Sequence, residues 1–163
     1  MSRIVVVSGN PRPGSRTSVL AIAVGEAIAE RTGSVPPTVI EVGELGAGLL
    51  TPGDEATAAA VTALREAELL VVATPTYKGS YTGVLKVLLD QLPAQALAGK
   101  TAVPVVTAGV PPQAAAAEAL LRQLLTELGA EVAAGLPVIE SDLPETKAIA
   151  EKYAVTHSKP TAQ

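Results

Sequence analysis

The chain has 163 residues, enough to bury the core of one domain but too few for separate cofactor and substrate domains. It contains no cysteine, which excludes disulfides, thiolate nucleophiles and iron–sulfur clusters, so any redox chemistry needs a bound organic cofactor. The formal net charge of -4 argues against nucleic-acid binding, and no apolar run reaches the ~18 residues of a membrane span, so we expect a soluble, cytoplasmic protein.

Runs of β-branched residues alternate with amphipathic segments along the chain. The predicted strands occupy residues 4–7, 38–42, 69–73, 101–107 and 131–139. The first predicted helix begins at Ser18 and ends at Gly33, and the others occupy residues 54–67, 82–92, 113–128 and 142–153. Pro104 indicates an edge-like or irregular register in the fourth strand, because proline has no N–H to donate.

This alternation predicts an α/β fold. Strand–helix–strand units with right-handed crossovers form a doubly wound, five-stranded parallel sheet with strand order 2-1-3-4-5, in a three-layer αβα arrangement. We expect a single domain over residues 1–163, with a flexible polar tail at 156–163.

The segment after the first predicted strand, residues 8–18 (SGNPRPGSRTS, the first loop), has the composition of an anion site. It lies outside the carboxyl end of a strand and at the start of a helix, where backbone N–H groups point toward a bound anion. Hydroxyl and guanidinium donors there suit a phosphomonoester, and the candidate residues are Ser8, Arg12, Ser15, Arg16, Thr17 and Ser18. The alternative is an ordinary helix start, in which the hydroxyls only cap the backbone.

Other motifs for nucleotide or metal chemistry are missing from the sequence. It contains neither G-x-x-x-x-G-K-[ST] nor G-x-G-x-x-G, which disfavours nucleotide hydrolysis and a Rossmann dinucleotide site. No His and carboxylate cluster has metal-ligand spacing, so we expect no metal. The single histidine, His157, falls in the polar tail and is interpreted as solvated.

The first loop, together with the string TPTYKGSYTGVLKVLLDQLP at residues 74–93, resembles the NADPH-dependent FMN reductase family of flavodoxin-like proteins. The likeness is strongest to reductases that serve flavin-dependent monooxygenases, and it runs from the first residues to about Val132. It implies that the first loop binds the ribityl phosphate of FMN.

Residues 75–81 (the second loop) follow the third predicted strand and face the same crevice in this strand order. The resemblance implies that this segment holds the isoalloxazine ring of FMN, through Pro75, Thr76, Tyr77 and Lys78. The alternative for Tyr77 and Tyr81 is ordinary packing with the hydroxyl at the surface.

Residues 107–113 (the third loop) close the crevice, and the resemblance assigns Thr107 and Gly109 to the flavin site. The family typically has Thr-Gly-Gly here with a histidine shortly after, whereas this chain has Ala108 and Gln113. Some family members also carry an inserted tyrosine at a subunit interface, and the matching position here is Ala119.

The resemblance predicts an NAD(P)H-dependent FMN reductase that supplies reduced flavin to a monooxygenase and forms a homodimer or homotetramer. Hydride transfer between cofactors needs alignment more than acid or base groups, so no catalytic side chain is expected. Three alternatives remain at this stage. One is a reductase of quinones, azo dyes or nitroaromatics with prosthetic FMN, another is a flavodoxin-like electron carrier, and the third is an interaction module that binds no flavin.

Overall fold

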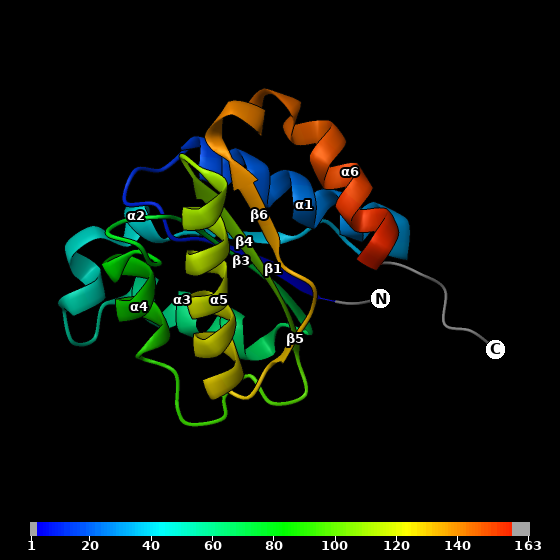
Figure 1. The fold of residues 1–163 in the computed structure, drawn as a ribbon. Coiled ribbons are helices and arrows are strands. Elements are labelled where there is room, and N and C mark those ends of the chain that lie inside the picture. The colour runs from blue at the N-terminus through cyan, green and yellow to red at the C-terminus, as the bar shows by residue number, and fades with distance from the viewer. Residues whose placement is uncertain (1–2, 158–163) are drawn as a thin grey trace.

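The computed structural model describes residues 3–157 and contains one parallel sheet between two layers of helices. Figure 1 shows α1 and α6 side by side on one side of the sheet and α5 on the other. The strands are β1 (Ile4–Ser8), β2 (Thr38–Glu41), β3 (Leu69–Pro75), β4 (Thr101–Ala108), β5 (Glu131–Val132) and β6 (Leu136–Ile139). The helices are α1 (Arg16–Thr32), α2 (Val42–Leu45), α3 (Glu55–Glu66), α4 (Gly83–Leu89), α5 (Pro111–Glu127) and α6 (Thr146–His157), with 3₁₀ helices at Gly46–Leu50 and Glu140–Glu145.

The strand order is β2-β1-β3-β4-β5, with β6 also paired to β4, which confirms the predicted 2-1-3-4-5 order. All strand pairs are parallel. The carboxyl ends of the strands therefore lie along one edge, where the loops that follow β1, β3 and β4 meet.

The two faces of the sheet bury two separate apolar cores. In β1, Val5 and Val7 contribute to the core covered by α3, α4 and α5, whereas Ile4 and Val6 contribute to the core covered by α1 and α6. Side chains of a strand point alternately to opposite faces, so a strand in the middle of the sheet must be apolar on both. This explains the continuous β-branched runs in the sequence.

The prediction of one strand over residues 131–139 is wrong. The chain forms two short strands, β5 and β6, which pair with the beginning and the end of β4. The N–H groups of Glu131 and Ala133 donate to the carbonyls of Lys100 and Ala102, so the backbone groups of these two residues point toward β5. Backbone groups two residues apart in a strand point to the same side, so the backbone nitrogen of Pro104 also points toward the neighbouring strand. Its missing N–H thus falls where the neighbouring strand is interrupted, and the irregular register predicted there is confirmed, although β4 lies inside the sheet.

Several helix boundaries also differ from the prediction: α4 ends at Leu89 and not at residue 92, α5 begins at Pro111 and not at residue 113, and α6 begins at Thr146 and not at residue 142. Helix α1 begins at Arg16, two residues before the predicted start, because Ser15 is its N-cap. Helix α6 extends to His157, so Thr156 and His157 are helical and do not belong to the predicted tail, whose residues 158–163 lie outside the described part of the chain. His157 is half-buried and stacks on Tyr153 with ring centroids 6.0 Å apart, so its interpretation as solvated is wrong.

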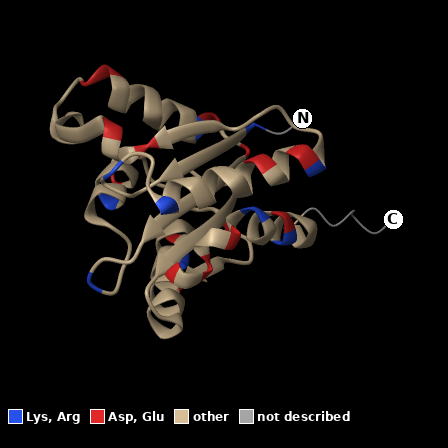
Figure 2. Cartoon of the chain, turned by 90° about the horizontal axis from the view of Figure 1, so that it is seen from above, with Lys and Arg blue, Asp and Glu red and all other residues tan. Residues whose placement is uncertain are grey.

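The charged residues are mixed in sign over the surface. Figure 2 shows Lys and Arg scattered among Asp and Glu rather than gathered on one face. Within residues 3–157, no helix combines the length and the apolar character needed to cross a membrane.

Candidate functional site

Hydrogen bonds join the three predicted loops to one another. The N–H of Gly9 in the first loop donates to the carbonyl of Ala73 in β3, at 2.8 Å. Thr17 Oγ1 lies 2.9 Å from Thr107 Oγ1, and Thr76 Oγ1 donates to the carbonyl of Thr107 at 2.9 Å. Segments separated by up to 90 residues in the chain are thereby fixed next to one another.

The start of α1 is built to present N–H groups. Gly14 adopts a left-handed φ of 71°, which favours glycine, and turns the chain into Ser15. Ser15 is extended, with φ -66° and ψ 168°, and its Oγ accepts the N–H of Ser18 at 3.2 Å. The N–H groups of the first turn have no partner within the helix, and the positive end of the helix dipole lies there. The geometry is that of an anion site.

Two of the predicted phosphate residues, Ser8 and Ser18, are fully buried beneath this turn. Their hydroxyl oxygens are 2.6 Å apart, and Ser15 Oγ lies 3.1 Å from Ser18 Oγ. The three serines thus form one hydrogen-bonded cluster, of which Ser15 is the most accessible member.

The residue that sequence reasoning missed is Glu41, the last residue of β2. Its carboxylate accepts from Ser18 Oγ at 2.6 Å and from the N–H of Gly14 at 2.9 Å. The predicted strand order places the carboxyl end of β2 beside that of β1, but the contact itself depends on the register, which pairs Ser8 with Glu41.

The two arginines of the first loop are exposed and lie further out. The N–H of Arg12 donates to Oδ1 of the buried Asn10 at 2.9 Å, which shapes the loop. The Arg16 guanidinium lies 3.5 Å from the carboxylate of Glu140, and both side chains are more than half exposed. An exposed pair of this kind contributes little to stability, so Arg16 can exchange this partner for a ligand.

The second loop ends in a tight two-residue turn. Tyr77 and Ser80 exchange backbone hydrogen bonds of 2.9 and 3.2 Å, and between them Lys78 and Gly79 have φ of 53° and 80°. Positive φ at both central positions is the geometry of a type I′ turn. Tyr77 is 45% exposed, so packing does not account for it, whereas Tyr81 is half-buried against the core.

The third loop is short and leads directly into α5. Thr107 is buried and Gly109 is exposed. A Cβ at Gly109 would lie 3.7 Å from the carboxylate of Glu140, so this position borders the same region as Arg16. The structure therefore brings all twelve predicted residues to one edge of the sheet, although five of them are buried, namely Ser8, Thr17, Ser18, Pro75 and Thr107.

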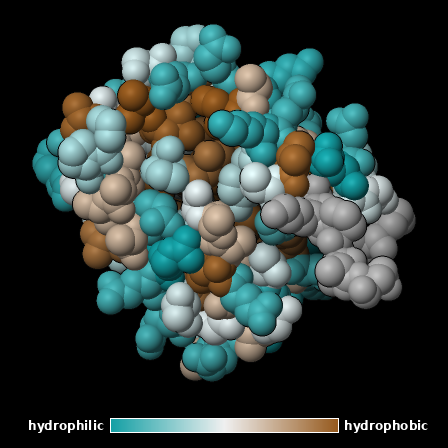
Figure 3. All heavy atoms as spheres, turned by 45° about the vertical axis from the view of Figure 1, so that its right-hand side comes forward, coloured by the Kyte–Doolittle hydropathy of each residue, from teal (hydrophilic) through white to brown (hydrophobic). Residues whose placement is uncertain are grey.

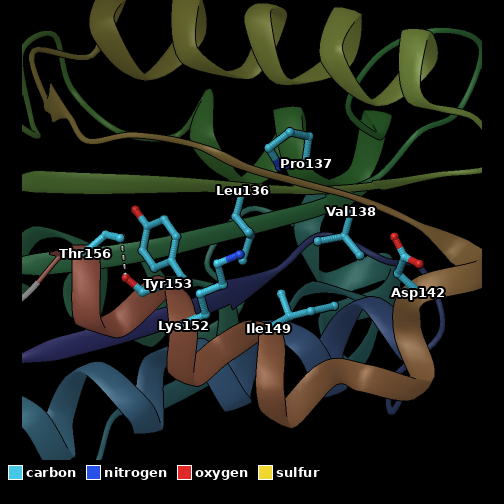
Figure 4. A pocket seen from close by; sticks show the side chains of 8 residues that line it. All are labelled: Leu136, Pro137, Val138, Asp142, Ile149, Lys152, Tyr153 and Thr156. Carbon is cyan, nitrogen blue, oxygen red and sulfur yellow. Dashed lines mark hydrogen bonds between the residues drawn. The ribbon is translucent and has the colours of Figure 1, made fainter.

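A separate pocket of about 350 Å³ lies between β6 and α6 (Figure 4). Figure 3 brings this side of the molecule forward and shows apolar surface gathered on part of it. The lining residues are Leu136, Pro137, Val138, Asp142, Ile149, Lys152, Tyr153 and Thr156. None of these residues belongs to the three loops, so this pocket is distinct from the candidate site.

Comparison with known proteins identifies the family. The sequence pattern of the family described as NADPH-dependent FMN reductase matches residues 2–142. The chain belongs to this family. The FMN reductase (NADPH) of Pseudomonas aeruginosa is 32% identical over 157 residues, which cover 91% of this chain and 83% of that protein. The NADH-dependent FMN reductase SfnF of Pseudomonas putida is 38% identical over 111 residues, 65% of this chain and 58% of that protein.

Coverage of the relatives is uneven. Besides its 58% coverage of SfnF, the chain spans only 36% of the length of an FMN reductase (NADPH) of Escherichia coli and 34% of that of an FMN reductase (NADPH) of Pseudomonas putida. A solved NADH:FMN oxidoreductase (EMOB) in its apo form has a TM-score of 0.82 at 33% identity, covering 99% of this chain and 92% of that one. These matches confirm both the flavodoxin-like fold and the family predicted from the sequence.

Proposed function

We propose that the chain is an NAD(P)H-dependent FMN reductase, which transfers a hydride from the nicotinamide to FMN and supplies reduced flavin to a partner monooxygenase. The proposal depends on one observation, the anion site that residues 14–18 form at the start of α1 (the cradle). The cradle lies at the carboxyl edge of the sheet, in a chain that belongs to the FMN reductase family. The names of the relatives support either nucleotide as the reductant, since some are NADPH-dependent and others NADH-dependent.

The donors at this cradle fit a phosphate. In the structure they already hold one oxyanion, the carboxylate of Glu41, through a hydroxyl and a backbone N–H. Serine hydroxyls, helix N–H groups and arginines are the donors that phosphate oxygens accept best. In our proposal, the phosphate is held by Ser8, Arg12, Ser15, Arg16, Thr17 and Ser18.

The flavin ring is assigned to the second and third loops. The turn that begins at Tyr77 presents an exposed aromatic side chain, which suits the flat face of a ring. The assigned residues are Pro75, Thr76, Tyr77, Lys78, Thr107 and Gly109. The hydrogen bond of Thr76 with Thr107 fixes the second loop to the third, and that of Thr17 with Thr107 fixes the first loop to the third.

When bound, FMN accepts the hydride, and the chain contributes alignment rather than a reacting side chain. The exposure of Tyr77 and Lys78 leaves one side of the loops open, where a nicotinamide can approach. No acid or base residue is assigned.

A fluorescence titration of the apoprotein with FMN, followed by NADPH and then NADH in the same cuvette, tests the proposal. Saturable FMN binding with rapid oxidation of either nucleotide is the expected result. Binding without nucleotide oxidation would identify an electron carrier instead, and absence of FMN binding would refute the proposal. Flavin that stays bound through purification, with ping-pong kinetics toward quinones or azo dyes, would indicate a prosthetic-FMN reductase.

We also propose that the chain is a single cytoplasmic domain that forms a homodimer or homotetramer. The resemblance to the family supports this assembly. In a homo-oligomer with closed symmetry, the same helix face can form the interface in every subunit. Size-exclusion chromatography with light scattering would give the mass of the assembly, and a monomer at all concentrations would contradict it.

A further inference from the structure

Glu41 occupies two hydrogen-bond donors at the start of α1. It ends β2, on a different element from the cradle, yet its two oxygens take the Ser18 hydroxyl at 2.6 Å and the Gly14 N–H at 2.9 Å. Glu41 is half-buried, so its side chain packs against the turn at the start of α1 and does not extend into solvent.

Counting hydrogens fixes the direction of this network. A carboxylate only accepts, and a serine hydroxyl carries one hydrogen, so Ser18 gives its hydrogen to Glu41. Ser18 then accepts from Ser8 at 2.6 Å and from Ser15 at 3.1 Å. The hydroxyls of Ser8 and Ser15 therefore donate to Ser18, and the hydroxyl of Ser18 donates to the carboxylate of Glu41. An incoming phosphate would need these same donors.

The charges around the cradle do not favour a second anion. A phosphomonoester carries about 1.5 to 2 negative charges at pH 7. Of the two loop cations, Arg16 is paired with Glu140 and must leave that exposed partner before it can balance the phosphate, while Glu41 adds a further negative charge. Like charges placed together in a partly buried site repel strongly.

We propose that Glu41 sets the FMN affinity of this chain. Its carboxylate competes with the FMN phosphate for Ser18 and Gly14, so FMN binds weakly enough to leave after reduction. This inference rests on the proposed function, in which FMN is a substrate and not a permanent prosthetic group. Glu41 thereby affects the relative affinity for FMN and riboflavin. Riboflavin has no phosphate, so the Glu41 carboxylate does not compete with it for Ser18 and Gly14.

The test compares Glu41→Gln with the unmodified chain in fluorescence titrations with FMN and with riboflavin. The amide keeps one acceptor oxygen for the loop and removes the charge. The dissociation constant for FMN should fall by about tenfold or more, whereas that for riboflavin should change by less than about twofold. The variant should also retain more flavin through purification. The matched control is Glu44→Gln, an exposed acid three residues away that makes the same change in net charge.

Unchanged or weaker FMN binding in Glu41→Gln, with normal riboflavin binding, would overturn the inference and show that Glu41 only braces the loop. An equal gain in Glu44→Gln would also overturn it, since the effect would then be one of net charge. Should Glu41→Gln not fold, Glu41→Ala replaces it, and the ratio of FMN to riboflavin affinity must rise in the same way. If the unmodified chain reduces FMN but Glu41→Gln gains no affinity, only this inference fails; if neither chain binds FMN, the proposed function fails with it.

Discussion

The side chain of Ser15 has a structural role in α1 and also belongs to the proposed phosphate site. Its Oγ caps α1 by accepting the N–H of Ser18, and it also contacts the Ser18 hydroxyl in the buried cluster. Loss of such a cap costs about 1 kcal/mol of stability. Any substitution of Ser15 therefore changes the free energy of unfolding as well as binding, and a ligand without phosphate is needed to separate the two effects.

The double variant Arg12→Ala with Ser15→Ala should weaken FMN binding more than riboflavin binding. Only FMN offers a phosphate to these residues, and each lost charge-assisted hydrogen bond is worth about 1.5 to 3 kcal/mol, roughly tenfold or more in affinity. Parallel fluorescence titrations measure both ligands. Equal losses for the two flavins would mean that the variant only disturbs the loop.

Tyr153 gives a prediction on pH. Burial raises the pKa of its phenol to about 12, only partly offset by the positive charge of Arg122. The native state therefore holds the proton more tightly than the unfolded state, whose phenol has a pKa near 10. This contribution is fully present below pH 10 and is lost as the pH rises from 10 to 12, with a loss of about 1 kcal/mol by pH 11.

Urea unfolding of the unmodified chain and of Tyr153→Phe at pH 9 and pH 11 measures this loss. The unmodified chain should lose about 1 kcal/mol more than the variant between the two pH values. Phenylalanine also removes the hydrogen bond to the carbonyl of Ala134, which lowers stability at both pH values but leaves the difference unaffected. Parallel losses would show that the phenol titrates normally.

At the scale of the element, the contact between α1 and β1 depends on a glycine. A Cβ at Gly25 would lie 2.4 Å from Cγ2 of Val6, closer than side-chain atoms can approach. Glycine lowers helix stability by about 1 kcal/mol relative to alanine, so its presence mid-helix needs a packing reason. The close approach of helix and strand provides it.

Gly25→Ala should therefore destabilise the protein, although alanine is the better helix former. Overpacking costs about 1 to 3 kcal/mol, which exceeds the gain in helix propensity. Gly83→Ala at the start of α4 is the matched control, because nothing lies within 4 Å of its Cβ position. Thermal unfolding of both should show a lower Tm for Gly25→Ala only. A stabilised Gly25→Ala would mean that α1 shifts away from the sheet at no cost.

The elements show how far the sequence could predict the fold. Periodicity identified the strands and helices and their order, since burial on one or both faces leaves a direct trace in residue type. It failed where tertiary contacts decide. Within residues 131–139, Gly135 and Pro137 weaken the predicted strand but do not by themselves indicate two strands, because the split depends on which part of β4 each segment meets. His157 falls in a segment that is polar in sequence, yet α6 continues through it and brings it onto Tyr153, one turn earlier.

At the scale of the whole molecule, the site is a product of strand order. The loops could be predicted to meet, because each follows the carboxyl end of a parallel strand. Their partners could not, since Thr107 reaches Thr17 and Glu41 reaches Ser18 only through the three-dimensional register. Within residues 3–157, every buried side-chain nitrogen and oxygen has a partner, so these contacts satisfy groups that would otherwise be buried without one.

The Thr17–Thr107 contact, which joins the first and third loops, allows a test of this coupling. Thr17→Val or Thr107→Val alone leaves a buried hydroxyl without its partner, at a cost of about 1 to 3 kcal/mol. The double variant removes both hydroxyls and keeps the shape, so its loss should be clearly smaller than the sum of the two single losses. Urea unfolding of the four chains gives the coupling energy, expected at about 1 kcal/mol. Additive losses would mean that the two loops are held together by packing alone, and that the hydroxyls contribute nothing to the alignment of the site.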